Sequence, residues 1–171
     1  MEFLEVVKAR HSIRAFTAKP IEAKLQVILD AANRAPSAGN LQAYEIYAVA
    51  HRAVLVALAD AAFGQEFIAQ APLALVFCAN PRRSARRYAQ RGTSLYCIQD
   101  ATIACAYAQL AATALGLASV WVGAFNDDAV REAIGVGADL LPVAILPIGH
   151  AGEEPHESSR RSLNSLVHSI S

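Results

Sequence analysis

A short basic motif near the start of the chain holds the side chains best suited to chemistry. In RHSIRAF, residues 10–16, the basic groups of Arg10, His11 and Arg14 surround the hydroxyl of Ser12. Guanidinium groups match phosphate oxygens in geometry, and their charge-assisted hydrogen bonds are stronger than neutral ones. The motif could therefore bind a phosphate. Taken alone, however, it is better explained as the basic end of a helix, where cations offset the helix dipole.

A second basic pair, Arg160 and Arg161, lies far away in the polar segment 150–171. If the fold brings this pair to the motif at 10–16, several guanidinium groups and one hydroxyl would converge on one phosphate. The chain as a whole is not basic, because 15 Asp and Glu residues balance its 15 Lys and Arg residues. A general nucleic-acid-binding protein needs a basic face, so we expect no nucleic-acid partner. These arginines are better interpreted as a local site.

The segment PSAGNLQ, residues 36–42, could meet a ligand through its backbone. It places the polar side chains of Ser37, Asn40 and Gln42 beside small residues that allow close approach. The alternative is an ordinary turn at the end of a helix, and from this segment alone the turn is the better explanation.

Gly123 interrupts the apolar segment WVGAF, residues 121–125, which otherwise has the pattern of a strand. A glycine inside a strand weakens it and often marks a bulge, or a point where another backbone or a ligand comes close. The sequence leaves both explanations open.

Other catalytic chemistries find little support. The three cysteines form no CxxC pair, so neither a disulfide framework nor a zinc site is indicated. His150, Glu153, Glu154 and His156 lie on a polar tail, where solvated groups are expected and a metal site is not. No Ser-His-Asp order or G-x-S-x-G elbow is present, and GVGADL lacks the third glycine of a dinucleotide fingerprint. We therefore predict no catalytic side chain.

The elements that must position these residues can be read from the apolar spacing. The second helix should end near Ala35, because Pro36 disfavours helical geometry in the residue before it. The basic segment 80–92 is expected to be an exposed connection. The pattern predicts helices near 3–7, 20–35, 52–62, 94–115 and 127–135, and strands at 44–50, 73–80, 118–125 and 142–150.

Length and composition indicate one domain that pairs with a second copy. The 171 residues suit a single domain, 1–171. With 54% hydrophobic and 18% charged residues, the core is large or some apolar surface is buried against a partner, and a homo-oligomer is the simplest form of this.

The longest apolar run, 94–115, is long enough to raise a transmembrane alternative. Alanine dominates the run, however, and Asp100 near its start would be unfavourable in a bilayer. We expect instead a buried central helix at a dimer interface, with no membrane partner. The N-terminal segment places acids before its bases and lacks a signal-peptide pattern, so a cytoplasmic location is expected.

Taken in order, these motifs resemble the nitroreductase family of FMN-dependent oxidoreductases, particularly its compact members. The resemblance rests on RHSIRAF, APSAGNLQ, the run from GTSLYCIQD to WVGAF, and a terminal RRSL, and it extends over essentially the whole chain. It implies an α+β fold, with a mainly antiparallel sheet flanked by helices, in an intertwined homodimer.

The resemblance also implies which residues bind FMN. The group that holds the phosphate and ribityl chain, its last basic member reaching toward the N1/O2 edge of the flavin, would be Arg10, His11, Ser12 and Arg14. A C-terminal basic residue, Arg160 or Arg161, would close on the same phosphate. The loop that the partner subunit presents to the flavin would be Pro36, Ser37 and Ala38, with Asn40 and Gln42 nearby. The strand end whose backbone meets the ring near N5 would be Val122, Gly123 and Ala124.

The implied activity is a ping-pong cycle. NADH or NADPH would reduce FMN, which would then reduce a nitroaromatic, a quinone or a similar small acceptor, with the chemistry on the flavin rather than on a side chain. The sequence departs from larger members before the second core strand, where GQEFIAQAP offers Gly64 and Phe67 in place of their Asn and Lys. Two alternatives remain: another flavin reaction on the same fold, such as reductive dehalogenation, flavin fragmentation or oxidation, or a non-catalytic flavin-binding or interaction dimer.

Overall fold

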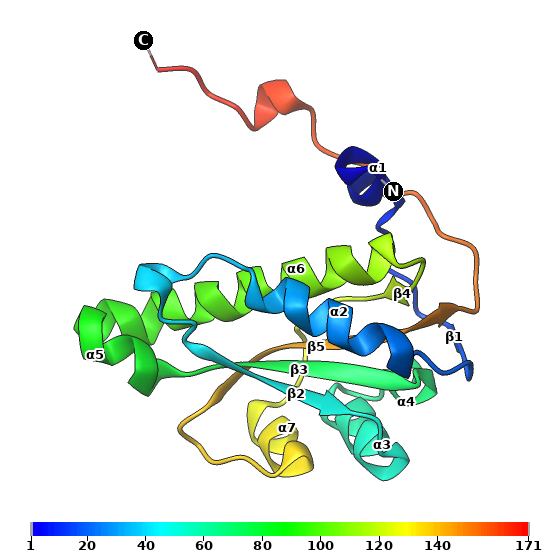
Figure 1. The fold of residues 1–171 in the computed structure, drawn as a ribbon, viewed down its shortest axis with the longest axis horizontal. Helices are drawn as coiled ribbons and strands as arrows, with labels where there is room; N and C mark the ends of the chain where they lie inside the picture. Colours follow the sequence, from blue (N-terminus) through cyan, green and yellow to red (C-terminus); the bar gives the residue numbers. More distant parts are fainter. Residues whose placement is uncertain (1, 171) are drawn as a thin grey trace.

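The computed structural model describes residues 2–170 and has an antiparallel sheet between two layers of helices (Figure 1). The sheet order is β1-β5-β3-β2, and β4 pairs with β5. Its strands are β1 (Phe16–Thr17), β2 (Tyr44–Val49), β3 (Leu73–Ala79), β4 (Ala118–Ser119) and β5 (Leu141–Ala151). The helices are α1 (Phe3–Ala9), α2 (Glu22–Asn33), α3 (Arg52–Ala61), α4 (Phe67–Gln70), α5 (Pro81–Arg91), α6 (Cys97–Ala114) and α7 (Asp127–Ile134). This confirms the predicted α+β fold.

The central strand β3 explains why both faces of the sheet are covered. All seven of its residues are buried, and successive side chains point to opposite faces of a strand. Leu75 and Phe77 pack in the core with α2 and α6, whereas Ala74 and Val76 pack in a second core with α3, α4 and α7. Figure 1 shows α2 and α6 on one side of the sheet and α3 and α7 on the other.

The central helix α6 lies in the first core along most of its length. Small side chains such as Ala101, Ala104 and Ala108 are fully buried, which lets the helix approach the sheet closely. The predicted buried helix in the run 94–115 is therefore confirmed, with its start preceded by a π-turn at Gly92–Tyr96. Within residues 2–170, no helix is both long enough and apolar enough to cross a bilayer.

Two predicted elements were wrong. The segment 118–125 is not one strand: β4 stops at Ser119, and beyond it only Val122 forms an isolated bridge, to Ile145 on β5. The segment 80–92, predicted to be an exposed connection, is largely exposed but forms the helix α5. Asn80 caps this helix by accepting a hydrogen bond from the backbone N–H of Arg83 at 3.1 Å, and Pro81 occupies the first turn, where it is favoured.

The two ends of the chain lie away from the sheet. Figure 1 shows α1 and the C-terminal tail projecting on the side of α6. Every residue from 151 to 170 is exposed, and the tail carries apolar side chains that nothing in the described chain covers: Leu163, Leu166, Val167 and Ile170.

Candidate functional site

The basic motif is held in place by the end of α1 and by β4. Arg10 closes α1, its backbone N–H donating to the carbonyl of Val6 at 3.0 Å. Two residues later the chain runs beside β4, where the N–H of Ile13 donates to the carbonyl of Ser119 at 3.1 Å. Because Ile13 is buried and side chains alternate along an extended segment, Ser12 and Arg14 are left exposed on the opposite side.

The tail returns to this motif and closes a cavity with it. The imidazole Nδ1 of His11 lies 3.1 Å from the backbone oxygen of His156. A cavity of about 330 Å³ is lined by Arg10, His11 and Arg160, with Lys8 beside them and Glu157 as its one acid. The structure thus brings Arg10 and His11 together with Arg160, whereas the other predicted residues of the two basic segments, Ser12, Arg14 and Arg161, do not line this cavity.

The two tail arginines differ in their contacts. Arg160 lines the cavity, whereas the guanidinium of Arg161 donates from Nη2 to the carbonyl of Ser165 at 2.9 Å, within its own turn of the tail. Arg14 lies on the other side of the motif: its backbone N–H donates to Oε1 of Glu153 at 2.5 Å, while its side chain is exposed.

The loop at 36–42 depends on a buried carboxylate that the sequence analysis did not select. Asp100 of α6 is 2% exposed, and its two oxygens accept hydrogen bonds from the N–H of Ala38 at 2.8 Å and of Ala43 at 3.2 Å. Burial, and then the charge of Asp100, raises the pKa of the neighbouring Tyr44 hydroxyl. The only sequence signal for this role was that Asp100 is the sole acid in the run 94–115.

Inside the loop the chain turns sharply. The hydroxyl of Ser37 accepts from the N–H of Gln42 at 3.0 Å, and the Gln42 amide donates to Oδ1 of Asn40 at 2.6 Å. Gly39, Asn40 and Gln42 all have φ values near +50°. Residues that carry a side chain rarely adopt this backbone conformation, and where they do, they often lie at functional sites. These hydrogen bonds, with those to Asp100, hold the loop in one defined conformation, so it is more than a simple helix-ending turn.

The loop borders its own cavity. Pro36, Ser37 and Ala38, with Tyr96 and Asp100 among the other residues, line a space of about 450 Å³. No residue lines both this cavity and the one at Arg10. Within one described chain, the predicted loop and the predicted basic residues are therefore in separate places.

The third segment predicted to bind a ligand, residues 122–124, lies at the end of the second core. Val122 is buried, and it exchanges two backbone hydrogen bonds of 2.9 Å with Ile145. Gly123 and Ala124 are exposed, and the carbonyl of Ala124 accepts from the side-chain amide of Gln65 at 3.2 Å. The turn before α4 is thus fixed to the segment whose backbone was predicted to meet a ligand.

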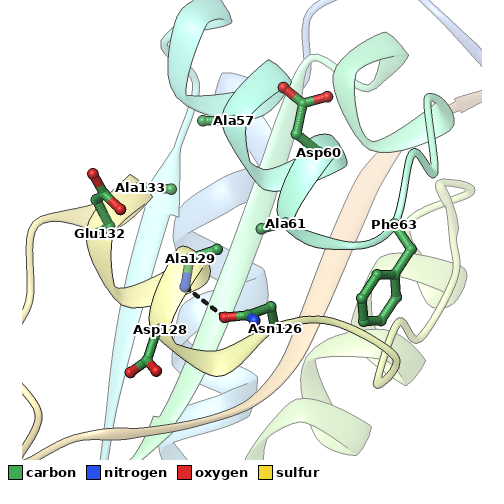
Figure 2. A pocket seen from close by; sticks show the side chains of 9 residues that line it. All are labelled: Ala57, Asp60, Ala61, Phe63, Asn126, Asp128, Ala129, Glu132 and Ala133. Carbon is green, nitrogen blue, oxygen red and sulfur yellow. Dashed lines mark hydrogen bonds between the residues drawn. The ribbon is translucent and has the colours of Figure 1, made fainter.

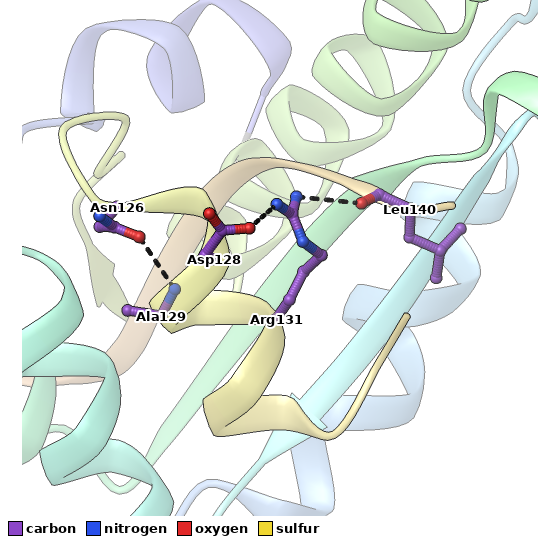
Figure 3. Close-up of polar contacts among 5 residues, drawn as sticks. All are labelled: Asn126, Asp128, Ala129, Arg131 and Leu140. Atoms are coloured by element: carbon purple, nitrogen blue, oxygen red, sulfur yellow. Dashed lines mark hydrogen bonds and ion pairs between the residues drawn. The ribbon is translucent and has the colours of Figure 1, made fainter. Parts of the chain in front are cut away.

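A larger cavity holds none of the predicted residues. It measures about 630 Å³ and lies between α3 and α7, where Asp60, Asp128, Glu132 and the exposed Phe63 line it (Figure 2). Its polar contacts are structural: Asn126 caps α7 at the N–H of Ala129, and Arg131 pairs with Asp128 and donates to the carbonyl of Leu140 (Figure 3). Three carboxylates make this cavity unsuitable for a phosphate.

Comparison with known proteins places the chain in a family. The model of the nitroreductase family matches residues 7–65 and 52–150. A NADH dehydrogenase from Thermus thermophilus is 32% identical in an alignment of 186 positions, gaps included, which covers 92% of this chain and 91% of the relative. An oxygen-insensitive NADPH nitroreductase from Salmonella typhimurium is 31% identical over 173 residues, which cover 96% of this chain and 72% of the relative.

A solved structure agrees with this result. The NADPH:FMN oxidoreductase from Vibrio harveyi, complexed with NAD+, matches with a TM-score of 0.89 at 28% identity, covering 99% of this chain and 77% of that one. Fold, family model and relatives point to the same group of enzymes. The chain therefore belongs to the nitroreductase family and is an oxidoreductase of the NAD(P)H nitroreductase and FMN reductase type.

Proposed function

We propose that this protein is a homodimeric FMN-dependent oxidoreductase that takes electrons from NADH or NADPH and passes them to a nitroaromatic, a quinone or a similar small acceptor. The observation that carries the proposal is the shared cavity of Arg10, His11 and Arg160, residues from opposite ends of the chain. Similarity to the Salmonella typhimurium NADPH nitroreductase and to the Vibrio harveyi NADPH:FMN oxidoreductase supports it.

The residues at this cavity fit a flavin phosphate. Arg10, Arg160 and Lys8 supply three cationic side chains against one carboxylate, that of Glu157. Two guanidinium forks can each bind phosphate oxygens bidentately, and a nearby hydroxyl, that of the exposed Ser12, can donate another hydrogen bond. Arg160 is thus the better choice than Arg161 for the C-terminal phosphate ligand.

When bound, FMN would supply the redox chemistry, accepting a hydride and returning electrons to the acceptor. The protein's part would be binding and electrostatics. The exposed guanidinium of Arg14 is free of ion pairs among residues 2–170 and would place positive charge at the N1/O2 edge of the ring. The exposed backbone at Gly123 and Ala124 would orient the ring near N5.

A second copy of the chain would complete the site. The loop at 36–42 borders a cavity apart from the basic motif, so it would have to meet the flavin of a partner subunit. The exposed apolar side chains of α1 and the tail, such as Phe3, Leu4 and Val167, would be buried in such a dimer. Burial of exposed apolar surface is a usual driving force for obligate dimers.

Cofactor content tests the proposal. The purified protein should be yellow and should release FMN on heat denaturation, in a ratio close to one per chain. Loaded with FMN, it should catalyse nitroaromatic reduction by NADH or NADPH. A colourless protein that cannot be reconstituted with FMN would overturn the proposal.

A further inference from the structure

Helix α5 carries an unusual concentration of positive charge. Five of the chain's 15 Lys and Arg residues lie in its 11 residues, which contain no Asp or Glu. All five are exposed: Arg82, Arg83, Arg86, Arg87 and Arg91. Among residues 2–170 the helix has a single ion pair, from Arg82 to Asp139 at 3.6 Å, and both partners are largely solvated. Such a surface in a neutral protein suits an anionic ligand.

Part of this helix is used to hold the loop at 36–42. Arg83 donates from Nε to the carbonyl of Leu41. A Cβ placed on Gly39 would lie 2.6 Å from the Tyr88 hydroxyl oxygen and 3.0 Å from a guanidinium nitrogen of Arg87, so helix and loop are in direct contact. Figure 1 shows α5 beside the turn that follows α2. Arg83 and Arg87, four residues apart on one face, therefore have a structural role.

The neighbouring face of the helix is available to a ligand. Arg82 and Arg86 are also four residues apart and form a second row. Arg86 has no hydrogen bond and no ion pair in the described part of the chain, and the Asp139 that faces Arg82 is 43% exposed. The row belongs to the helix whose other face contacts the loop, and at the end of that helix Arg91 lies 5.3 Å from the ring of Tyr96, which lines the loop's cavity.

We propose that Arg86, with Arg82 one turn away, binds the 2′-phosphate of NADPH and makes NADPH the preferred electron donor over NADH. The proposal rests on the proposed function, in which the loop beside α5 faces the flavin. The nicotinamide must reach the flavin, and the 2′-phosphate lies at the other end of the dinucleotide. NADH has no charged group there, so guanidinium groups that contact the 2′-phosphate discriminate between the two donors.

The test compares Arg86→Ala with Arg52→Ala, an exposed arginine on α3 that serves as the matched control. Loss of one charge-assisted contact should lower kcat/KM for NADPH by about tenfold and for NADH far less. The preference of the wild-type protein for NADPH should also decrease as salt is raised. Arg86→Lys, which keeps the charge but loses the fork, should recover part of the preference.

A binding measurement separates this proposal from the proposed function. Adenosine carrying both 2′- and 5′-phosphates should bind the wild-type protein more tightly than AMP, and Arg86→Ala should abolish the difference, whether or not flavin is present. Equal losses for NADPH and NADH, or no loss for either, would overturn the assignment. A protein that neither donor reduces, yet that still discriminates the two nucleotides through Arg86, would refute the proposed function alone.

Discussion

Asp100 is the residue on which the loop at 36–42 depends most directly. Its carboxylate accepts from two backbone donors, and no described group could replace it at both. Asp100→Ala should lower the free energy of unfolding by about 3 kcal/mol, since each buried donor left without an acceptor costs roughly 1–3 kcal/mol. Urea denaturation measures this loss in the free energy of unfolding. Asp100→Asn keeps one amide oxygen and should lose less, and a change below about 0.5 kcal/mol in the alanine variant would contradict the account.

The two tail arginines provide a matched pair for the phosphate site. Arg160 lines the cavity with Arg10, whereas Arg161 is bound to its own backbone. Arg160→Ala should weaken FMN binding by about tenfold or more, because a charge-assisted contact to the phosphate is lost, and Arg161→Ala should change it less than about threefold. Fluorescence titration of the apoprotein with FMN gives both dissociation constants. The reverse order would show that the tail adopts another position when the flavin is bound.

Residue types alone favoured a helix end for the basic motif and a simple turn for the loop, and only the order of the motifs, through the resemblance to the nitroreductase family, selected residues such as Arg10 and Ser12 as binding residues. The groups that support these segments were not predicted. Asp100 was not selected, because its role depends on which backbone donors the fold brings to it. Similarly, the choice between Arg160 and Arg161 depends on the path of the tail, and adjacent identical residues carry no sequence signal for it.

At the scale of elements, the contact between α5 and the loop makes Gly39 sensitive to substitution. Its φ of +57° disfavours any side chain, and an added Cβ would clash with Tyr88. Gly39→Ala should therefore lower the free energy of unfolding by about 2 kcal/mol or more. Gly135→Ala is the control, because φ there is +70° but nothing lies within 4 Å of an added Cβ, so only the backbone penalty of about 1 kcal/mol applies. Thermal or urea unfolding compares the free energies of unfolding of the two variants. Equal losses would contradict the predicted clash, because they would mean that the loop and the helix move apart readily.

Most elements with a strong apolar pattern were predicted correctly, with the segment 118–125 as the exception, and the helix without such a pattern was missed. Strands β3 and β5 are long, mostly apolar and buried, and β2 is apolar except for the exposed Glu45, so their pattern is informative. Helix α5 buries little beyond Ser84 and has hardly any apolar face, so the apolar spacing on which the prediction rested could not indicate it. The segment 118–125 has a largely apolar, strand-like sequence, but it pairs with β5 only at Ala118, Ser119 and Val122.

At the scale of the whole molecule, the proposed dimer would cover the exposed apolar side chains of α1 and the tail. Light scattering on the eluted protein should give twice the 18.2 kDa chain mass. Val167→Asp, at a tail position 64% exposed in the single chain, should shift the protein toward monomer because it places a charge in the proposed interface. Val56→Asp, on α3 and 41% exposed, is the matched control and should remain dimeric. A wild-type monomer at micromolar concentration would contradict the dimer.

Anaerobic reduction of the bound flavin tests the central claim most directly. The FMN-loaded protein should lose its flavin absorbance when NADPH or NADH is added, and the absorbance should return when a nitroaromatic or quinone is supplied in stoichiometric amount. Both half-reactions must proceed separately, because one site serves donor and acceptor in turn. A bound flavin that neither nicotinamide bleaches, although dithionite does, would contradict the account and leave the protein as a flavin-binding dimer without this activity.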